Sequence, residues 1–235
     1  MSKWIFNDQQ PQLIPDPRQW SRDFTLDSTK PLGLFTHIHK CGGISVVRLL
    51  FSTGLSHHIY SLASPERPCR DRTNGVRLEH LADATLADAF KFTFVRNPYD
   101  RAVSAWKFFQ QFHEMEVEFV PFLQVVRDPT TADIVPAGKK KQLRLHTQPA
   151  THPSYRLAQK DFVGRLETFA DDMQHILKTL GLPTDLPLHW RNRSEHTRYS
   201  DYYDAEALSL VEDIYGEDIE TLGYSFGDDG RPIIG

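Results

Sequence analysis

Apolar and polar residues alternate along two short stretches of the chain, and each stretch runs into a helical pattern. The segments LGLFTHIH at 32–39 and KFTFVRN at 91–97 have the period of strands. ISVVRLLFSTG follows the first and YDRAVSAWKFFQQF follows the second, both with one apolar helical face. Two successive strand–loop–helix units predict an α/β protein with a parallel sheet.

Two further helices are predicted in the C-terminal half. The first ends at Gly181 with Pro183 just beyond it, which is a usual helix stop. The second begins after Asp204, which we expect to be its N-cap. Their apolar positions recur at helical spacing and predict packing against the core: Phe169, Met173, Ile176, Leu177 and Leu180 in the first, and Leu208, Val211, Ile214 and Tyr215 in the second.

The length of 235 residues fits one substantial core. We expect an N-terminal arm at 1–31, which is polar and proline-containing, a single domain at 32–226 and a C-terminal tail at 227–235.

Composition and charge narrow the class of protein. The chain is 40% hydrophobic and 25% charged with a net charge of -4, which argues against a general nucleic-acid or membrane-surface binder. Its first residues do not resemble a signal peptide, and no stretch approaches the roughly 20 apolar residues of a membrane span. We therefore expect a soluble cytoplasmic protein; with only Cys41 and Cys69 available, we predict no structural disulfide.

The segment HKCGGIS at 39–45 joins the first predicted strand to its helix and indicates an anion site. A glycine-rich turn before a helix presents unpaired backbone N–H groups at the positive end of the helix dipole. Lys40 precedes Gly42 and Gly43, whereas the standard P-loop places its lysine after the glycines. The alternative is a tightly packed turn in which Lys40 is a surface charge.

The second junction lies in FTFVRNPYDRAVSAW at 92–106. Arg96 ends the strand, where open α/β sheets bind ligands, and its planar fork suits a phosphate. Pro98 opens the helix and Ser104 lies near its second turn. One alternative is that Arg96 forms an ion pair with Asp100. Another is that Asp100 and Arg101 are ordinary first-turn and surface charges.

Together the two junctions resemble the sulfotransferase superfamily, specifically the membrane-type carbohydrate branch with its short soluble bacterial members. The resemblance covers roughly 32–226 and implies a three-layer P-loop-like fold that uses 3′-phosphoadenosine 5′-phosphosulfate as donor. It implies that Arg96 and Ser104 bind the 3′-phosphate, and that the first loop cradles the 5′-phosphosulfate through Lys40, Cys41, Gly42, Gly43, Ile44 and Ser45. Ile44 departs from the family pattern, because a hydroxyl residue is usual there.

Later segments are less specific. DFVGRLETFADDM and HWRNRSEHTRYSDYYD look like later blocks of the family, and by analogy Arg191, Asn192, Arg193 and Ser194 form a loop over the nucleotide. A solvated basic turn is the alternative.

Sulfuryl transfer needs an aligned acceptor oxygen, a base, and positive charge near the leaving phosphate. We expect Lys40 to supply the charge and His80, which lies between the two loops, to be the base. His37 and His39, which share one face of the strand, are alternative bases or packed core residues. We predict no metal, since no third ligand follows this pair at recognisable spacing.

The acceptor is expected to be a small molecule or glycan. The basic run Lys139, Lys140, Lys141 and Arg144, together with Arg67, Arg70, Arg72 and Arg77, would suit an acceptor that already carries negative charge, or forms solvated loops. Two other functions compete: a magnesium-dependent small P-loop kinase, and a nucleotide-binding module without catalysis. The kinase would require a lysine after the glycines, whereas Lys40 precedes them. It would also require an acidic magnesium ligand at a strand end, whereas the second strand ends in Arg96.

Overall fold

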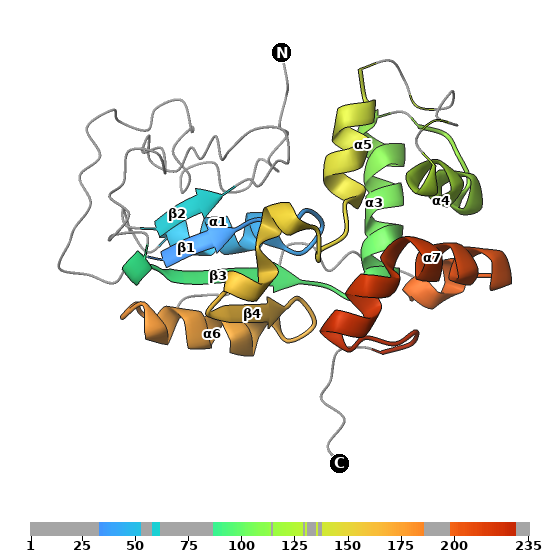
Figure 1. Cartoon of the computed structure of the whole chain (residues 1–235). Helices are drawn as coiled ribbons and strands as arrows, with labels where there is room; N and C mark the ends of the chain where they lie inside the picture. The colour runs from blue at the N-terminus through green and yellow to red at the C-terminus, as the bar shows by residue number, and fades with distance from the viewer. Residues whose placement is uncertain are drawn as a thin grey trace.

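A parallel β-sheet organises one half of the molecule. The computed structural model describes residues 33–52, 58–61, 87–113, 115–128, 130, 135, 138–185 and 198–228. Within them the strand order is β2-β1-β3-β4, with all neighbours parallel. The strands are β1 (Gly33–Thr36), β2 (His58–Ser61), β3 (Phe90–Val95) and β4 (Phe162–Arg165) (Figure 1). The predicted α/β fold with a central parallel sheet is confirmed.

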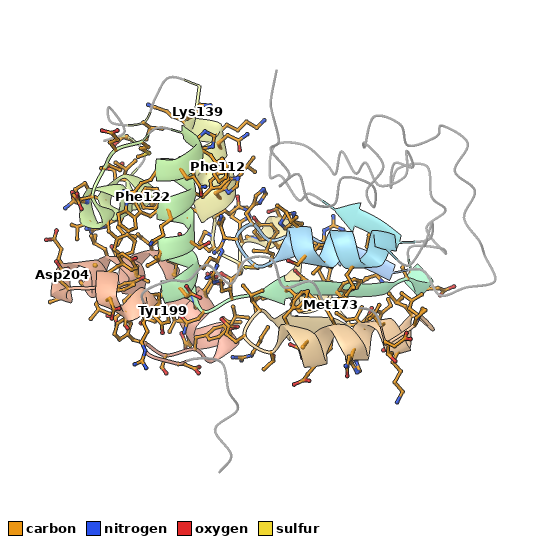
Figure 2. All side chains as sticks on the ribbon, turned by 180° about the vertical axis from the view of Figure 1, so that it is seen from behind. Phe112, Phe122, Lys139, Met173, Tyr199 and Asp204 are labelled. Atoms are coloured by element: carbon orange, nitrogen blue, oxygen red, sulfur yellow. The ribbon has the colours of Figure 1, made fainter. Side chains whose placement is uncertain are left out.

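One face of this sheet is aromatic. The register pairs Phe35 with Phe92 and Phe92 with Phe162, so these rings lie side by side, with 5.3 Å between the ring centres of Phe35 and Phe92. Helices α1 (Gly43–Ser52) and α6 (Phe169–Thr179) contribute to the same core. In α6, Phe169 contacts Phe94 of β3, and Met173 is fully buried beside the sheet (Figure 2). This packing holds β1 and β3 side by side against α6.

The predicted end of α6 is also observed. Gly181 has a φ of +66°, the left-handed conformation that glycine adopts readily at a helix end. The opposite side of the sheet is crossed by a segment that carries the short 3-10 helices η3 (Pro153–Tyr155) and η4 (Leu157–Gln159) (Figure 1). Tyr155 from this segment is completely buried in the sheet core.

A group of helices stands beside the carboxyl ends of the strands. It contains α3 (Pro98–His113), α4 (Phe119–Arg127), α5 (Lys140–Thr147) and α7 (Ala205–Leu222), preceded by η5 (Tyr199–Tyr202) (Figure 1). Their shared core includes Phe109, Phe122 and Val211. Asp204 caps α7 as predicted, because its carboxylate accepts a hydrogen bond of 2.8 Å from the Ala207 amide. The carboxyl ends of the strands therefore face this group of helices.

The structure changes one expectation about the basic run. Lys140, Lys141 and Arg144 lie on helix α5 and not in a loop, because Leu143 and Thr147 give that segment a buried face. Cys41 is a buried free thiol, and Cys69 lies outside the described residues. Within the described residues, no helix combines the length and apolar character needed to cross a membrane.

Candidate functional site

The connection between β1 and α1 forms the first half of the site. Lys40 and Gly42 both have positive φ, 67° and 75°, so the chain turns sharply before α1. The amides of Ser45 and Val46 donate to the Gly42 carbonyl over 2.9 and 3.2 Å, which starts the helix directly at the loop. The positive end of the α1 dipole therefore faces this connection, an arrangement suited to an anion.

Close packing explains both glycines of the loop. A β-carbon on Gly43 would lie 2.1 Å from Cδ2 of His37, and one on Gly42 would lie 2.6 Å from Cδ1 of Leu166. Both distances are far below van der Waals contact. The tight packing of the glycine turn that the alternative proposed is thus present, but Lys40 is not the surface charge that the same alternative assumed, because its ammonium lies over the ring of Phe108.

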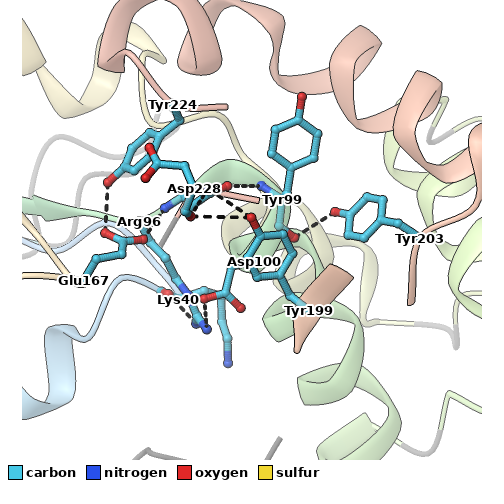
Figure 3. Close-up of polar contacts among 10 residues, drawn as sticks. Lys40, Arg96, Tyr99, Asp100, Glu167, Tyr199, Tyr203, Tyr224 and Asp228 are labelled. Atoms are coloured by element: carbon cyan, nitrogen blue, oxygen red, sulfur yellow. Dashed lines mark hydrogen bonds and ion pairs between the residues drawn. The ribbon is translucent and has the colours of Figure 1, made fainter. Parts of the chain in front are cut away.

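Arg96 joins the second half of the site to the first. It follows β3, the neighbour of β1, and its Nη1 donates to the Lys40 carbonyl over 3.3 Å. The same guanidinium is paired with Asp100, with Nε and Nη2 lying 2.8 and 2.7 Å from Oδ2 (Figure 3). The ion pair considered in the sequence analysis is therefore present, and it aims the arginine at the first loop.

Asn97 and Glu167 support this second junction from behind. The Asn97 amide donates to Glu167 Oε1 over 2.6 Å, and the Asn97 side-chain amide donates to the Asp228 carbonyl over 2.9 Å. Tyr224 donates to the other oxygen of Glu167 over 3.0 Å (Figure 3). Burial raises the pKa of Glu167 against these hydrogen bonds. This support could not be identified from the sequence, because its members are far apart in the chain.

Arg101 is not the surface charge that the sequence allowed. Its side chain is 2% exposed, its Nε donates to the His39 carbonyl over 3.1 Å, and it also bonds the Gln148 carbonyl. Nη1 lies 3.6 Å from Asp218 Oδ2, and this buried carboxylate accepts a 2.7 Å bond from the Ala150 amide. Arg101 therefore fixes the first loop to the helical group.

The Lys40 ammonium lies over the ring of Phe108, 4.4 Å from its centre. Burial, together with the charge of Arg96, lowers the pKa of Lys40 to about 8. On α3, Ser104 lies three residues after Arg101 and four residues before Phe108. At this spacing the three side chains lie on the same side of the helix. Lys40, Arg96 and Ser104 thus belong to one region.

Histidines line the same region. His37 stacks on His39 at 5.0 Å between ring centres, and His39 contacts His146 of α5 at 4.5 Å. His146 in turn stacks on Phe108 at 4.3 Å. Burial lowers the pKa of His37 to about 3, of His39 to about 4 and of His146 to about 2, and nearby positive charges act in the same direction. His146 was missed from sequence, because no motif or spacing connects it to the loops.

The remaining predicted residues differ in placement. Cys41 is 1% exposed and its thiol donates to the His39 carbonyl over 3.6 Å, with burial raising the pKa of the thiol to about 11. Ile44 is 49% exposed at the start of α1. His80 and the predicted nucleotide loop with Arg191, Arg193 and Ser194 lie outside the described residues. The part of the chain that is described contains no group of three or more histidine, cysteine or acidic residues suited to a metal ion.

A glycine turn at a helix start, with an arginine from the neighbouring strand beside it, is an arrangement with which α/β proteins bind phosphate groups. The model of the sulfotransferase family matches residues 22–225, and the chain therefore belongs to the sulfotransferase family.

Curated relatives agree with this membership. Carbohydrate sulfotransferase 12 of Mus musculus is 26% identical over 61% of this chain and 41% of its own length, and that of Xenopus laevis is 26% identical over 67% and 45%. The chain thus spans less than half the length of these relatives. A crystal structure of a sulfotransferase from Alicyclobacillus acidocaldarius has a TM-score of 0.33 and 18% identity over 59% of each chain.

Proposed function

We propose that this chain transfers a sulfuryl group from 3′-phosphoadenosine 5′-phosphosulfate to an acceptor hydroxyl, on a carbohydrate. One observation carries the proposal: Arg96 donates to the Lys40 carbonyl over 3.3 Å. The two sequence segments that resemble the family's donor loops are thereby in direct contact. A donor with phosphate groups at both ends of its ribose requires such a pair of adjacent anion sites.

Each half has a distinct task in donor binding. The backbone N–H groups from Gly42 to Ser45 and the start of α1 receive the 5′-phosphosulfate. Arg96, already oriented by Asp100, offers its outer N–H groups to the 3′-phosphate together with the Ser104 hydroxyl. Arg191, Arg193 and Ser194 complete the nucleotide contacts by family analogy.

Transfer forms a bond between the acceptor oxygen and sulfur and breaks the bond between sulfur and the bridging oxygen of the 5′-phosphate. Negative charge develops on that phosphate, and Lys40 is the cation positioned to stabilise it. The hydroxyl proton passes to a base, for which the sequence offers His80, His37 and His39. The ring of His37 is fixed against Gly43, which favours the other two.

The acceptor is proposed to approach from α5. Lys140 and Lys141 are exposed on this helix, whose residue His146 contacts His39 of the first loop. An acceptor bearing negative charge would meet these lysines before reaching Lys40. Replacing Lys139, Lys140 and Lys141 by glutamine should raise the acceptor KM and leave donor affinity unchanged. An unchanged KM would remove this part of the proposal.

The donor site is tested by calorimetry with adenosine 3′,5′-bisphosphate and, separately, ATP with magnesium. The wild type should bind the bisphosphate without magnesium, and Arg96→Ala should lose most of that affinity. Arg127→Ala is the matched control, because Arg127 also forms an arginine–aspartate pair, at 2.6 Å to Asp213, on the exposed side of α4. Preference for ATP with magnesium would favour a kinase. Bisphosphate binding without sulfate transfer would favour a non-catalytic module.

A further inference from the structure

The guanidinium of Arg96 already has partners inside the protein. Its Nε and Nη2 lie 2.8 and 2.7 Å from one oxygen of Asp100, Oδ2, and its Nη1 donates to the Lys40 carbonyl over 3.3 Å (Figure 3). Each of the three guanidinium nitrogens therefore has a contact before a ligand arrives, and two of the three contact one carboxylate. One N–H group on each terminal nitrogen is left for a phosphate.

The pair of Arg96 and Asp100 differs from the buried pair of Arg101 and Asp218. Asp218 is 1% exposed and also accepts a hydrogen bond from the Ala150 amide, so its carboxylate is occupied inside the protein. The side chains of Arg96 and Asp100 are 17% and 31% exposed. A phosphate can therefore reach this pair from solvent, and it then lies beside the charge of Asp100.

The 3′-phosphate is the part of the donor that the transfer leaves unchanged. The donor and its product, adenosine 3′,5′-bisphosphate, carry the same group there, so a contact with it stabilises both equally and does not lower the barrier to transfer. Tight binding at this end instead slows release of the product, and product release limits the turnover of many enzymes. Turnover is therefore faster when a nearby charge limits the affinity for the 3′-phosphate.

Asp100 supplies such a charge. It lies in the first turn of α3, four residues after Arg96. Its negative charge offsets the positive charge of the guanidinium, so the 3′-phosphate meets a pair without net charge and not a free cation. Two negative groups that contact one guanidinium also repel each other. The carboxylate thus weakens the binding of a phosphate at Arg96.

We propose that Asp100 limits the affinity of Arg96 for the 3′-phosphate and so speeds the release of adenosine 3′,5′-bisphosphate. This role rests on the sulfuryl transfer proposed above. Asp100 acts through Arg96 and not on the reacting atoms: its carboxylate orients the guanidinium and at the same time reduces the charge that the guanidinium offers. The two effects are separable, because an asparagine keeps an oxygen that accepts a hydrogen bond from Nε but carries no charge.

The test compares Asp100→Asn, which removes the charge, with Asp100→Ala, which removes the charge and the orienting contact. Asp213→Asn is the matched control, because Asp213 forms an exposed pair with Arg127, at 2.6 Å to its Nε. Calorimetry measures the affinity for adenosine 3′,5′-bisphosphate and for adenosine 5′-monophosphate, which lacks the 3′-phosphate. Stopped-flow kinetics with a fluorescent analogue of the bisphosphate measure its dissociation rate without any acceptor, and thermal unfolding shows that the variants are folded.

Asp100→Asn should bind the bisphosphate about fivefold to tenfold more tightly than the wild type and release it correspondingly more slowly, because a repelling charge beside the 3′-phosphate is removed. Its affinity for the monophosphate should change little, and Asp213→Asn should match the wild type with both nucleotides. Asp100→Ala should bind the bisphosphate less tightly than Asp100→Asn, because Arg96 loses its orienting contact. A merely structural role of Asp100 would not produce tighter binding.

A bisphosphate affinity of Asp100→Asn equal to or below that of the wild type would show that Asp100 only orients Arg96 and would overturn the proposal. Equal tightening of the monophosphate would overturn it as well, because the effect would then not involve the 3′-phosphate. A wild type that does not bind the bisphosphate would overturn the donor site itself. A wild type that binds the bisphosphate but transfers no sulfate would overturn the transferase, and with it the role of Asp100 in turnover, whatever the affinity of Asp100→Asn.

Discussion

The ring of His37 occupies the space that any side chain at position 43 would need: its Cδ2 lies 2.1 Å from where a β-carbon of Gly43 would stand. The ring is held there by stacking on Phe35 at 6.0 Å and on His39 at 5.0 Å between ring centres. The first turn of α1 is therefore pressed against the end of β1. This contact sets the curvature of the loop that we propose to hold the 5′-phosphosulfate.

Gly43→Ala should weaken binding of adenosine 3′,5′-bisphosphate by about tenfold or more, because the methyl group would push α1 away from His37. The double variant His37→Ala with Gly43→Ala removes the obstructing ring and should recover part of the lost affinity. Titration calorimetry of the three proteins measures this coupling. Equal affinity of Gly43→Ala and wild type would contradict it.

Ile44 offers a gain-of-affinity prediction. Ile44→Thr places a hydroxyl where the family usually has one, and because residue 44 is 49% exposed the change costs little packing. One added hydrogen bond should tighten bisphosphate binding roughly threefold to tenfold. Ile44→Val has the same shape without the hydroxyl and is the control. If threonine and valine bind alike, residue 44 does not contact the phosphate.

Donor binding should weaken as pH rises through about 8, the lowered pKa of Lys40. The bound phosphate requires the ammonium form, and above this pH the free protein must first take up a proton. Lys40→Arg remains charged and should lose this dependence, whatever its affinity at neutral pH. Calorimetry at several pH values between 7 and about 9.5 distinguishes the two proteins. A wild-type affinity that stays constant over this interval would refute the assignment.

The histidine contacts predict acid sensitivity. In the folded protein the pKa values of His37, His39 and His146 are about 3, 4 and 2, below the unfolded value of 6.5. Between the folded and the unfolded pKa values, the unfolded chain therefore binds more protons than the folded protein. The stability that is present above pH 6.5 is lost as the pH falls toward 4. In urea unfolding at several pH values, the free energy of unfolding should fall by up to about 1.4 kcal/mol per pH unit for each titrating ring. His146→Phe should reduce the slope, whereas His175→Phe should not.

Local patterns were sufficient to predict the elements that form the site. Strand alternation located β1 and β3, and Asp204 and Gly181 marked helix ends that the structure confirms. The order of the lysine and the two glycines identified the first loop, because the geometry of this loop is encoded by neighbouring residues. The contact between Arg96 and the Lys40 carbonyl follows from two parallel strands being adjacent.

Contacts from distant segments could not be predicted in this way. His146 reaches the loop only because α5 folds beside α3, and the basic run at 139–144 that precedes it was expected to be a loop. For Arg101 the sequence allowed an ordinary surface charge, because a single arginine at a helix start carries no sign of its buried partners. The base His80 and the loop with Arg191, Arg193 and Ser194 stay predictions from the family resemblance.

The burial of Arg101 also bears on the order of events during synthesis. Its guanidinium holds the His39 carbonyl, but it is itself held beside Asp218, which lies near the C-terminal end of α7. A chain still on the ribosome makes both proposed phosphate loops early, yet lacks this carboxylate until helix α7 has emerged. Donor binding would then begin only after the segment that contains Asp218 has been synthesised, so a product truncated before Asp218 would not compete for the donor.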